Sequence, residues 1–255
     1  MTKYRVSTFP FRDFSLEQFV GGLADIGISS IELGKPHFQD LSAEQASILR
    51  AECGLPFKSM LSTEDIAGPE GLEDQIAILN IAQNLSVSTV SIASGGTEEA
   101  TEYEIDLIID RLKSLTEEAE RRNLKLQFYS HGGWMAYNLD RCERIFSSIV
   151  SDSFGYYYCP YHFYMAGDDP VVALERLADR LMGVYFDCGV DPITKESTYP
   201  LWVPEIDYHA VCQAIKRTAY TGEIMLISFG TKQDSIQMFL DGIEKARNLV
   251  DQLMS

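Results

Sequence analysis

Short runs rich in β-branched and aromatic residues alternate along the chain with longer segments in which apolar residues recur every three or four positions. The short runs predict strands at Tyr4–Thr8, Ser30–Leu33, Phe57–Met60, Thr89–Ala93, Lys125–Tyr129, Phe154–Tyr158, Leu181–Phe186 and Glu223–Ile227. The longer segments predict a helix after each strand, at Leu16–Ile26, Ser42–Ala51, Leu72–Leu85, Glu104–Arg121, Leu139–Val150, Pro170–Ala178, Ile206–Lys216 and Ser235–Leu253. Helix-start signals support several of these boundaries, because Ser15 and Ser42 are each followed three residues later by Gln, and Asp169 precedes Pro170.

The alternation predicts one α/β domain over residues 1–255. Strand–helix units of this kind form parallel strands covered by helices, and eight of them can close into a barrel of about 250 residues. An open doubly wound sheet is the alternative, but it usually carries a glycine-rich turn after its first strand. Residues 7–12 (STFPFR) hold no glycine. We therefore predict a single parallel eight-stranded (β/α)8 TIM barrel.

Composition and charge narrow the range of partners. The chain has 255 residues, with 21 Lys and Arg against 38 Asp and Glu, so its formal net charge is −17 at pH 7. Such a field repels a phosphate backbone, and we expect no nucleic-acid partner. No apolar run approaches the roughly 20 residues that cross a bilayer, and the first residues lack the apolar stretch of a signal peptide. We expect no membrane association, a cytoplasmic location and reduced cysteines.

Candidate chemistry gathers where the predicted strands end. In a barrel of this kind the active site lies at the carboxyl ends of the strands. His37, His131 and His162, three of the four histidines, follow strands 2, 5 and 6; Trp134 also follows strand 5, and Asp187 follows strand 7. An aromatic run near strand 6 is expected to divide between core packing and surfaces that stack on a polar ligand. The run comprises Tyr156–Tyr158, Tyr161, Phe163 and Tyr164.

Four segments of the chain match a known family in order and spacing. They are FSLEQF with GISSIEL in residues 14–33, SHGGW at 130–134, CPYH with AGDDP in 159–170, and YTGEI at 220–224. Together they resemble the xylose isomerase-like TIM barrel superfamily of sugar and sugar-phosphate isomerases and epimerases, over nearly the whole length. The resemblance implies a small carbohydrate-like ligand at the mouth of the barrel.

The resemblance also implies one divalent metal, Mn²⁺, Mg²⁺ or Co²⁺, held by carboxylates from strands 5 and 8, an Asp after strand 6 and a His after strand 7. The matching positions here read Tyr129, Cys159, Tyr185 and Ser228. Because hard cations prefer carboxylate oxygens, we predict that this cofactor is absent. One alternative stays open, in which Asp187, Cys159 and imidazoles form a site better suited to Zn²⁺.

The leading hypothesis is an isomerase or epimerase with a remodelled, metal-free site. A base would remove a proton next to a carbonyl, and hydrogen-bond donors would stabilise the oxyanion that forms. The catalytic candidates are Glu32, His131, His162 and Asp187, with Glu32 or Asp187 as the base and the imidazoles as donors. The substrate-binding candidates are His37, Tyr129, Trp134, Cys159, Tyr185 and Ser228.

Two other hypotheses fit the same residues, since a fold does not fix its chemistry. One is a catalytically inactive barrel that binds a sugar-like ligand as a sensor or as a subunit. The other is a lyase or hydrolase for a polyol-like substrate, in which Cys159 pairs with His131 or His162 as a nucleophile. A homodimer is also consistent with the sequence.

Overall fold

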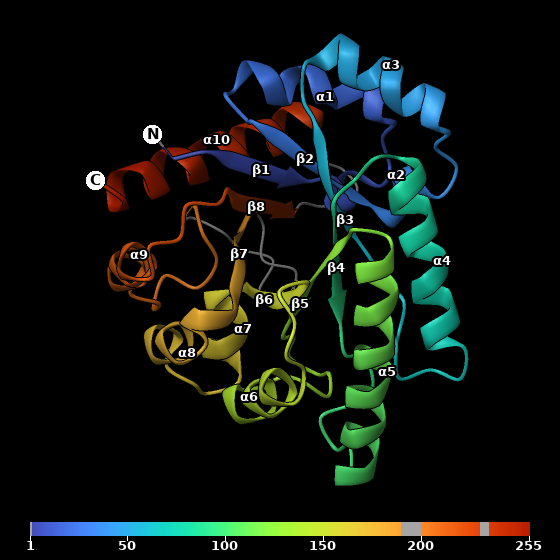
Figure 1. Ribbon diagram of the computed structural model, residues 1–255. Coiled ribbons are helices and arrows are strands. Elements are labelled where there is room, and N and C mark those ends of the chain that lie inside the picture. Colours follow the sequence, from blue (N-terminus) through green and yellow to red (C-terminus); the bar gives the residue numbers. More distant parts are fainter. Residues whose placement is uncertain (1, 190–199, 230–234) are drawn as a thin grey trace.

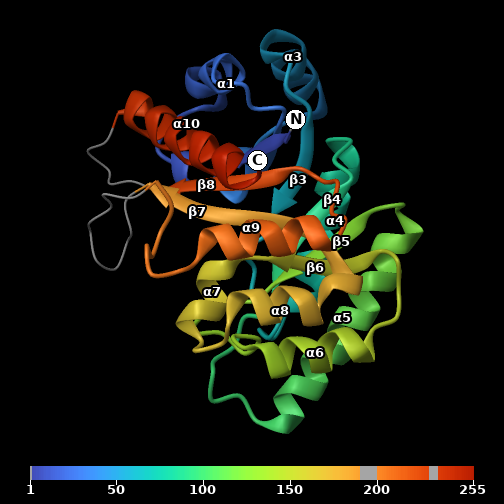
Figure 2. The same ribbon diagram turned by 90° about the vertical axis from the view of Figure 1, so that its left-hand side faces the viewer.

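The computed structural model describes residues 2–189, 200–229 and 235–255, and its eight strands close into a barrel in sequence order (Figure 1). Every neighbouring pair is parallel, including the pair of β1 and β8 that closes the ring. The (β/α)8 TIM barrel that the sequence predicts is therefore confirmed. Because all strands run the same way, their carboxyl ends meet at one mouth, towards which β7 and β8 point on the left of Figure 2.

The strands have nearly the predicted bounds. They are β1 Tyr4–Ser7, β2 Ser30–Gly34, β3 Phe57–Leu61, β4 Thr89–Ala93, β5 Lys125–Tyr129, β6 Phe154–Tyr158, β7 Leu181–Gly189 and β8 Ile224–Phe229. The largest difference is in β7, which continues past its predicted end at Phe186. It stays paired with β8 as far as Gly189 opposite Phe229. This extension places Asp187 within a strand rather than a loop.

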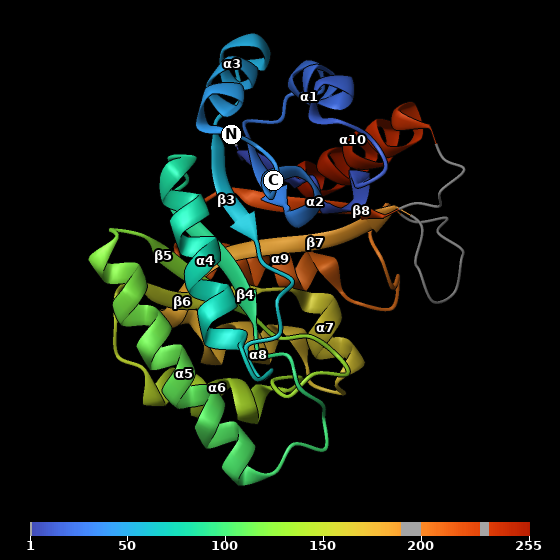
Figure 3. The ribbon, with the colours of Figure 1, turned by 90° about the vertical axis from the view of Figure 1, so that its right-hand side faces the viewer.

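Helices cover the outside of the barrel on all sides, as Figures 1 and 3 show from two directions. The long ones are α1 Leu16–Asp25, α3 Ala43–Cys53, α4 Gly71–Asn84, α5 Glu102–Arg121, α6 Leu139–Ser148, α8 Pro170–Arg176, α9 Tyr208–Arg217 and α10 Ile236–Leu253. Capping boxes at Ser15 and Ser42 begin α1 and α3, as predicted. The Asp169 side chain accepts two backbone N–H groups at the start of α8.

Short helices that the sequence pattern does not predict follow two strands at the mouth. They are α2 Lys35–Phe38 after β2 and α7 Pro160–Met165 after β6. Each is too short for an apolar periodicity to appear, although each has a proline in its first turn, which favours a helix start. A 3-10 turn, η1 Phe9–Phe11, follows β1 in the same way. Of these three turns, η1 and α7 bring side chains to the mouth, among them Phe9 and His162.

Charged and hydroxyl side chains gather at the amino-terminal end of the barrel, in a cluster that we call the base network (Arg5, Glu32, Lys58, Ser59 and Glu223). Arg5 Nη2 donates to Glu223 Oε2 at 2.9 Å, and Lys58 Nζ lies 2.8 Å from Glu223 Oε1. Arg5 Nη1 also donates to Ser59 Oγ at 2.9 Å, and Ser59 donates to Glu32 Oε2 at 2.9 Å. Glu223 is thus paired with two basic groups. Glu32 instead accepts hydrogen bonds from Ser59 and Ser91, and burial raises the pKa of its carboxyl group.

In the described part of the chain, no helix has the length and apolar character needed to cross a membrane. Cys142, Cys159, Cys188 and Cys212 are free thiols in buried positions. The cytoplasmic location, the absence of a nucleic-acid partner and the homodimer stay predictions.

Candidate active site at the barrel mouth

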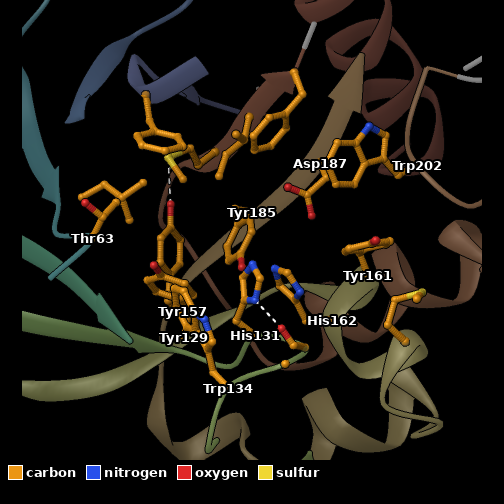
Figure 4. Close-up of a pocket in the computed structure, with 18 of the residues that line it drawn as sticks. Thr63, Tyr129, His131, Trp134, Tyr157, Tyr161, His162, Tyr185, Asp187 and Trp202 are labelled. Carbon is orange, nitrogen blue, oxygen red and sulfur yellow. Dashed lines mark hydrogen bonds between the residues drawn. The ribbon is translucent and has the colours of Figure 1, made fainter. Parts of the chain in front are cut away.

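A cavity of about 660 Å³ opens at the carboxyl ends of the strands (Figure 4). Its aromatic lining comprises Phe9, Tyr129, Trp134, Tyr157, Tyr161, Tyr185, Trp202 and Phe229. The polar side chains that line it, tyrosine hydroxyls aside, are Thr63, Glu98, His131, His162 and Asp187. A concave site with apolar walls and a few converging polar groups is the usual form of a small-molecule binding site.

The alternation of side chains along β6 and β7 builds one wall of this cavity. Tyr185 and Asp187 are two residues apart on β7, so both face inwards. Tyr157 on β6 faces inwards as well, and its two tyrosine neighbours pack outwards against the helices. Gly183 leaves the space for the Tyr157 ring, because a Cβ at that position would stand 2.7 Å from a ring carbon. The aromatic run therefore divides between core and cavity, as the sequence analysis expects.

The aromatic rings contact one another around the cavity. Tyr185 lies edge-on to Tyr129, with ring centroids 6.3 Å apart, and 4.7 Å from Tyr157. Burial is the first cause that raises the pKa of both Tyr129 and Tyr185. Both phenols therefore stay protonated at neutral pH, so each can donate a hydrogen bond to an oxygen of a bound molecule.

Two imidazoles stand together at the mouth. The rings of His131 and His162 have centroids 4.4 Å apart, and His131 also stacks on Trp134 at 4.3 Å. His131 Nδ1 lies 2.7 Å from the Gly132 carbonyl oxygen. Because a carbonyl oxygen only accepts, Nδ1 must carry the proton, and Nε2 is left as the acceptor nitrogen. Burial lowers the pKa of both histidines, and His131 lowers that of His162 further, so both rings are neutral at pH 7.

Cys159, His162 and Asp187 form a compact group beside the imidazoles. The Cys159 thiol donates to Asp187 Oδ2 at 3.1 Å, and one potential ligand atom from each of the three residues lies within 4.8 Å of the others. Trp202 adjoins this group, since its backbone N–H donates to the Asp187 carbonyl oxygen at 3.0 Å. Burial, and then the charge of Asp187, raises the pKa of the Cys159 thiol. A protonated thiol is a poor nucleophile, so this geometry does not favour a nucleophilic Cys159.

The structure brings six of the ten predicted site residues to the cavity wall: Tyr129, His131, Trp134, His162, Tyr185 and Asp187. Cys159 lies directly behind the wall, where it contacts Asp187. Their roles in binding and catalysis stay predictions.

Glu32 and His37 do not reach the cavity, which corrects the placement expected from the sequence. Glu32 is fully buried within the base network. The His37 ring lies 2.9 Å from the Phe14 carbonyl oxygen through Nε2 and 2.9 Å from Thr8 Oγ1 through Nδ1. The carbonyl fixes Nε2 as the donor, so Nδ1 accepts from the hydroxyl. Both nitrogens of His37 are thus used to hold neighbouring segments together.

Ser228 is also misplaced in the sequence analysis, because its side chain faces the outside of the barrel. Its Oγ lies 3.2 Å from the position that a Cβ on Gly242 of α10 would occupy. Ile227, one residue earlier, lines the cavity instead. Since side chains alternate along a strand, an assignment shifted by one residue selects the wrong face.

Sequence reasoning misses several lining residues of the mouth, among them Thr63, Glu98 and Trp202. Thr63 and Glu98 come from the segments after β3 and β4, in which the sequence analysis names no site candidates. Trp202 lies in the segment before α9, next to an antiparallel bridge between Cys188 and Leu201. The available signal is the barrel itself, because in this fold the segments that follow the strands build the mouth.

The donor set does not fit the hard divalent cation that the resemblance implies. The four corresponding positions are Tyr129, Cys159, Tyr185 and, on the inward face of β8, Ile227. These residues offer two protonated phenols, a thiol and an aliphatic side chain. None supplies a carboxylate oxygen, which Mn²⁺ and Mg²⁺ require in most protein sites.

The fold is a (β/α)8 barrel with a candidate small-molecule site in an aromatic cavity at the strand ends. The chain belongs to the xylose isomerase-like TIM barrel family, which it matches over residues 20–249. The resemblance noted in the sequence is thereby confirmed. A comparison with curated proteins finds no match.

Several solved structures share this fold at low sequence identity. L-ribulose 3-epimerase has a TM-score of 0.83 and 14% identity, with 100% of this chain and 95% of that chain covered. IOLI protein with a binding zinc atom has a TM-score of 0.79 and 15% identity, with 99% and 98% covered. A xylose isomerase-like TIM barrel/4-hydroxyphenylpyruvate dioxygenase fusion protein has a TM-score of 0.78 and 18% identity, but this chain spans only 44% of it while 98% of this chain is covered.

Proposed function

We propose that the protein is an isomerase or epimerase that moves a proton on the carbon next to the carbonyl group of a small carbohydrate-like molecule. The observation that carries this proposal is the placement of a neutral imidazole, His131, on an aromatic cavity whose phenols can donate hydrogen bonds. The family and the similarity to L-ribulose 3-epimerase favour the same class of reaction.

His131 is the base in this proposal, in place of the carboxylates expected from the sequence. Glu32 lies in the base network, and Asp187 already accepts a hydrogen bond from the Cys159 thiol. By contrast, the hydrogen bond of His131 Nδ1 to Gly132 leaves Nε2 as a proton acceptor. A positioned imidazole of this kind contributes about 10²- to 10⁴-fold to the rate of proton transfer.

The phenols of Tyr129 and Tyr185 are the groups that stabilise the developing oxyanion. They occupy positions at which the resemblance implies metal ligands. Tyr129 supplies a hydrogen-bond donor where the resemblance implies a carboxylate, and Tyr185 supplies one where it implies a histidine. Preorganised donors act strongly in a cavity from which water is largely excluded. The surrounding rings, such as Trp134 and Trp202, offer flat surfaces on which the C–H face of a sugar ring can stack.

Deuterium exchange tests this function without requiring the product to be known. The protein is incubated in D₂O with L-ribulose, D-fructose and a 3-keto-glucoside, and loss of the proton signal next to the carbonyl is followed by NMR. We expect exchange with at least one class, and a rate about 10²- to 10⁴-fold lower in His131→Gln. His209→Gln, on the exposed surface of α9, is the matched control and should keep the wild-type rate.

The alternative hypotheses predict different outcomes in the same samples. A ligand that binds, as seen by saturation transfer, but never exchanges would reject the enzyme and support a barrel that only binds. Exchange that persists unchanged in His131→Gln would reject His131 as the base. Net cleavage of a substrate, blocked by Cys159→Ala, would support the lyase or hydrolase.

A further inference from the structure

We propose that Cys159, His162 and Asp187 form a binding site for a borderline-soft divalent cation such as Zn²⁺. The group lies at one side of the cavity, between the ends of β6 and β7, and its donors are a thiol, an imidazole and a carboxylate. This set differs from the mainly carboxylate cage that the resemblance implies, and only Cys159 stands at a corresponding position.

Rigid elements place the three donors. Cys159 caps the start of α7, and His162 follows three residues later, so both lie on the same side of that helix turn. Asp187 faces inwards from β7, which pairs with β6 through Tyr158 and Val184. All three side chains are buried, with exposed fractions of 1%, 6% and 5%. A site held by strand ends and a helix turn keeps its donors in a fixed arrangement.

The distances suit a cation of the size of Zn²⁺. Zn–S bonds of about 2.3 Å and Zn–N or Zn–O bonds of about 2.0–2.2 Å place neighbouring ligand atoms of a tetrahedral site roughly 3.3–3.8 Å apart. The Sγ and Oδ2 atoms are already 3.1 Å apart, and the largest separation among the three ligand atoms is at most 4.8 Å. A separation of 4.8 Å exceeds the tetrahedral range by about 1 Å, so side-chain adjustments of that size would bring all three donors to one cation.

The chemistry of the donors selects the cation. Thiolate and imidazole favour Zn²⁺ or Co²⁺ over Mg²⁺ and Mn²⁺. When the S–metal bond forms, the Cys159 thiol loses its proton to solvent, and its hydrogen bond to Asp187 is broken. The resulting thiolate and carboxylate together neutralise the two positive charges, which a buried site requires.

Three protein ligands leave the fourth position of a tetrahedral site open, as in catalytic rather than structural zinc sites. Since His162 and Asp187 line the cavity, we place the open position on the cavity side, where the His131 ring stands 4.4 Å from the His162 ring. An oxygen of a bound molecule could occupy it within reach of His131. The cation site itself requires no such molecule, so it can be tested independently of the proposed reaction.

Cobalt substitution is the direct test. The whole chain is freed of metal with a chelator and titrated with CoCl₂, while absorption is recorded. We expect a thiolate-to-cobalt charge-transfer band in the near ultraviolet that saturates at one Co²⁺ per chain. Cys159→Ala should abolish the band, whereas Cys212→Ala, which removes a thiol equally buried in α9, should retain it.

Competition with a chromogenic chelator gives the Zn²⁺ affinity. We expect it to fall at least about 100-fold in Cys159→Ala and in Asp187→Asn, since even the loss of groups that only support a ligand costs about 10- to 100-fold. Mg²⁺ and Mn²⁺ should not displace Zn²⁺ at equal concentrations.

The proposal is wrong if stoichiometric Co²⁺ gives no charge-transfer band, or if the band survives in Cys159→Ala. Equal competition by Mg²⁺ would also reject this donor set. If Cys159→Ala fails to fold, the cobalt spectrum of the wild type and the Zn²⁺ affinity of Asp187→Asn test the proposal instead. A protein that exchanges deuterium yet binds no Zn²⁺ would overturn this site alone, and the reverse result would overturn the proposed reaction alone.

Discussion

The two ends of the barrel interior bury polar groups in different ways. In the base network, Arg5 and Lys58 contact Glu223, and Ser59 links Arg5 to Glu32. At the mouth, the polar side chains instead border a cavity and are surrounded by aromatic rings.

This difference separates residues whose polar groups are used within the fold from residues whose polar groups are available to a ligand. In the base network, the charge of Glu223 is compensated within the protein by Arg5 and Lys58. The neutral imidazoles and protonated phenols on the cavity retain the ability to exchange protons with a bound molecule. Buried titratable groups with strongly shifted pKa values in a cavity are candidates for function for that reason.

The largest effect should come from breaking the base network with Glu223→Gln. Burial alone would raise the pKa of Glu223, but hydrogen bonds from Lys58, Ser30 and Arg5 outweigh it and lower the pKa to about 2. The carboxylate is thus more acidic in the fold than in the unfolded chain, where its pKa is about 4.3. Its contribution is present above that value and is lost as the pH falls towards 2. We expect the substitution to lower the free energy of unfolding by about 3 kcal/mol at pH 7.

Urea unfolding across a pH series measures this effect. The difference between wild type and Glu223→Gln should shrink as the pH falls from about 5 towards 3. Glu44→Gln, in the exposed first turn of α3, is the control and should show no comparable difference. If the difference in unfolding free energy between wild type and Glu223→Gln stays constant over this pH range, the carboxylate charge is not what stabilises the base network.

A smaller effect should distinguish two histidines near the mouth. His37→Ala removes two hydrogen bonds and a contact with Phe19, so we expect a loss of about 2 kcal/mol in unfolding free energy. His131→Ala should cost less stability than that, yet suppress deuterium exchange. Thermal unfolding and exchange rates, measured on both variants below their melting temperatures, test this. Equal losses of stability would remove the distinction between structural and functional histidines.

The smallest effect should come from a helix outside both regions. A Cβ on Gly21 of α1 would meet nothing within 4 Å, so Gly21→Ala should raise the unfolding free energy by up to about 1 kcal/mol through helix propensity. Gly22→Ala is the matched control, because its Cβ would stand 2.6 Å from a Leu240 methyl carbon. Thermal melts of both variants check the contrast, and exchange rates should remain unchanged in Gly21→Ala. A stabilised Gly22→Ala would show that the packing of α1 against α10 is looser than described.

The fold could be predicted because its signals are local and repeated. The bounds of β4, β5 and β6 follow from runs of β-forming residues, and the starts of α1 and α3 follow from capping boxes. The end of β7 could not be found in this way. Its last residues are held by pairing with β8, and such pairing is a tertiary effect that propensity does not carry.

The site could be predicted only in part, since it depends on which face of a strand a residue occupies. Tyr129 and Tyr185 were placed correctly because the strand ends were nearly right, whereas Ser228 was assigned one residue away from Ile227. Glu32 lies near the end of β2 and His37 lies just after it, where site residues are expected. Their hydrogen-bond partners, however, come from distant segments that no local pattern reveals. The closeness of Cys159 to Asp187 likewise needs the closed barrel.

The two tryptophans of the chain, Trp134 and Trp202, both line the mouth cavity. Selectively excited tryptophan fluorescence therefore originates entirely from residues of the mouth, without any added label. A molecule that enters the cavity replaces water beside the indole rings and changes the emission directly. The intrinsic fluorescence of the unmodified protein can thus serve as a screen for ligands.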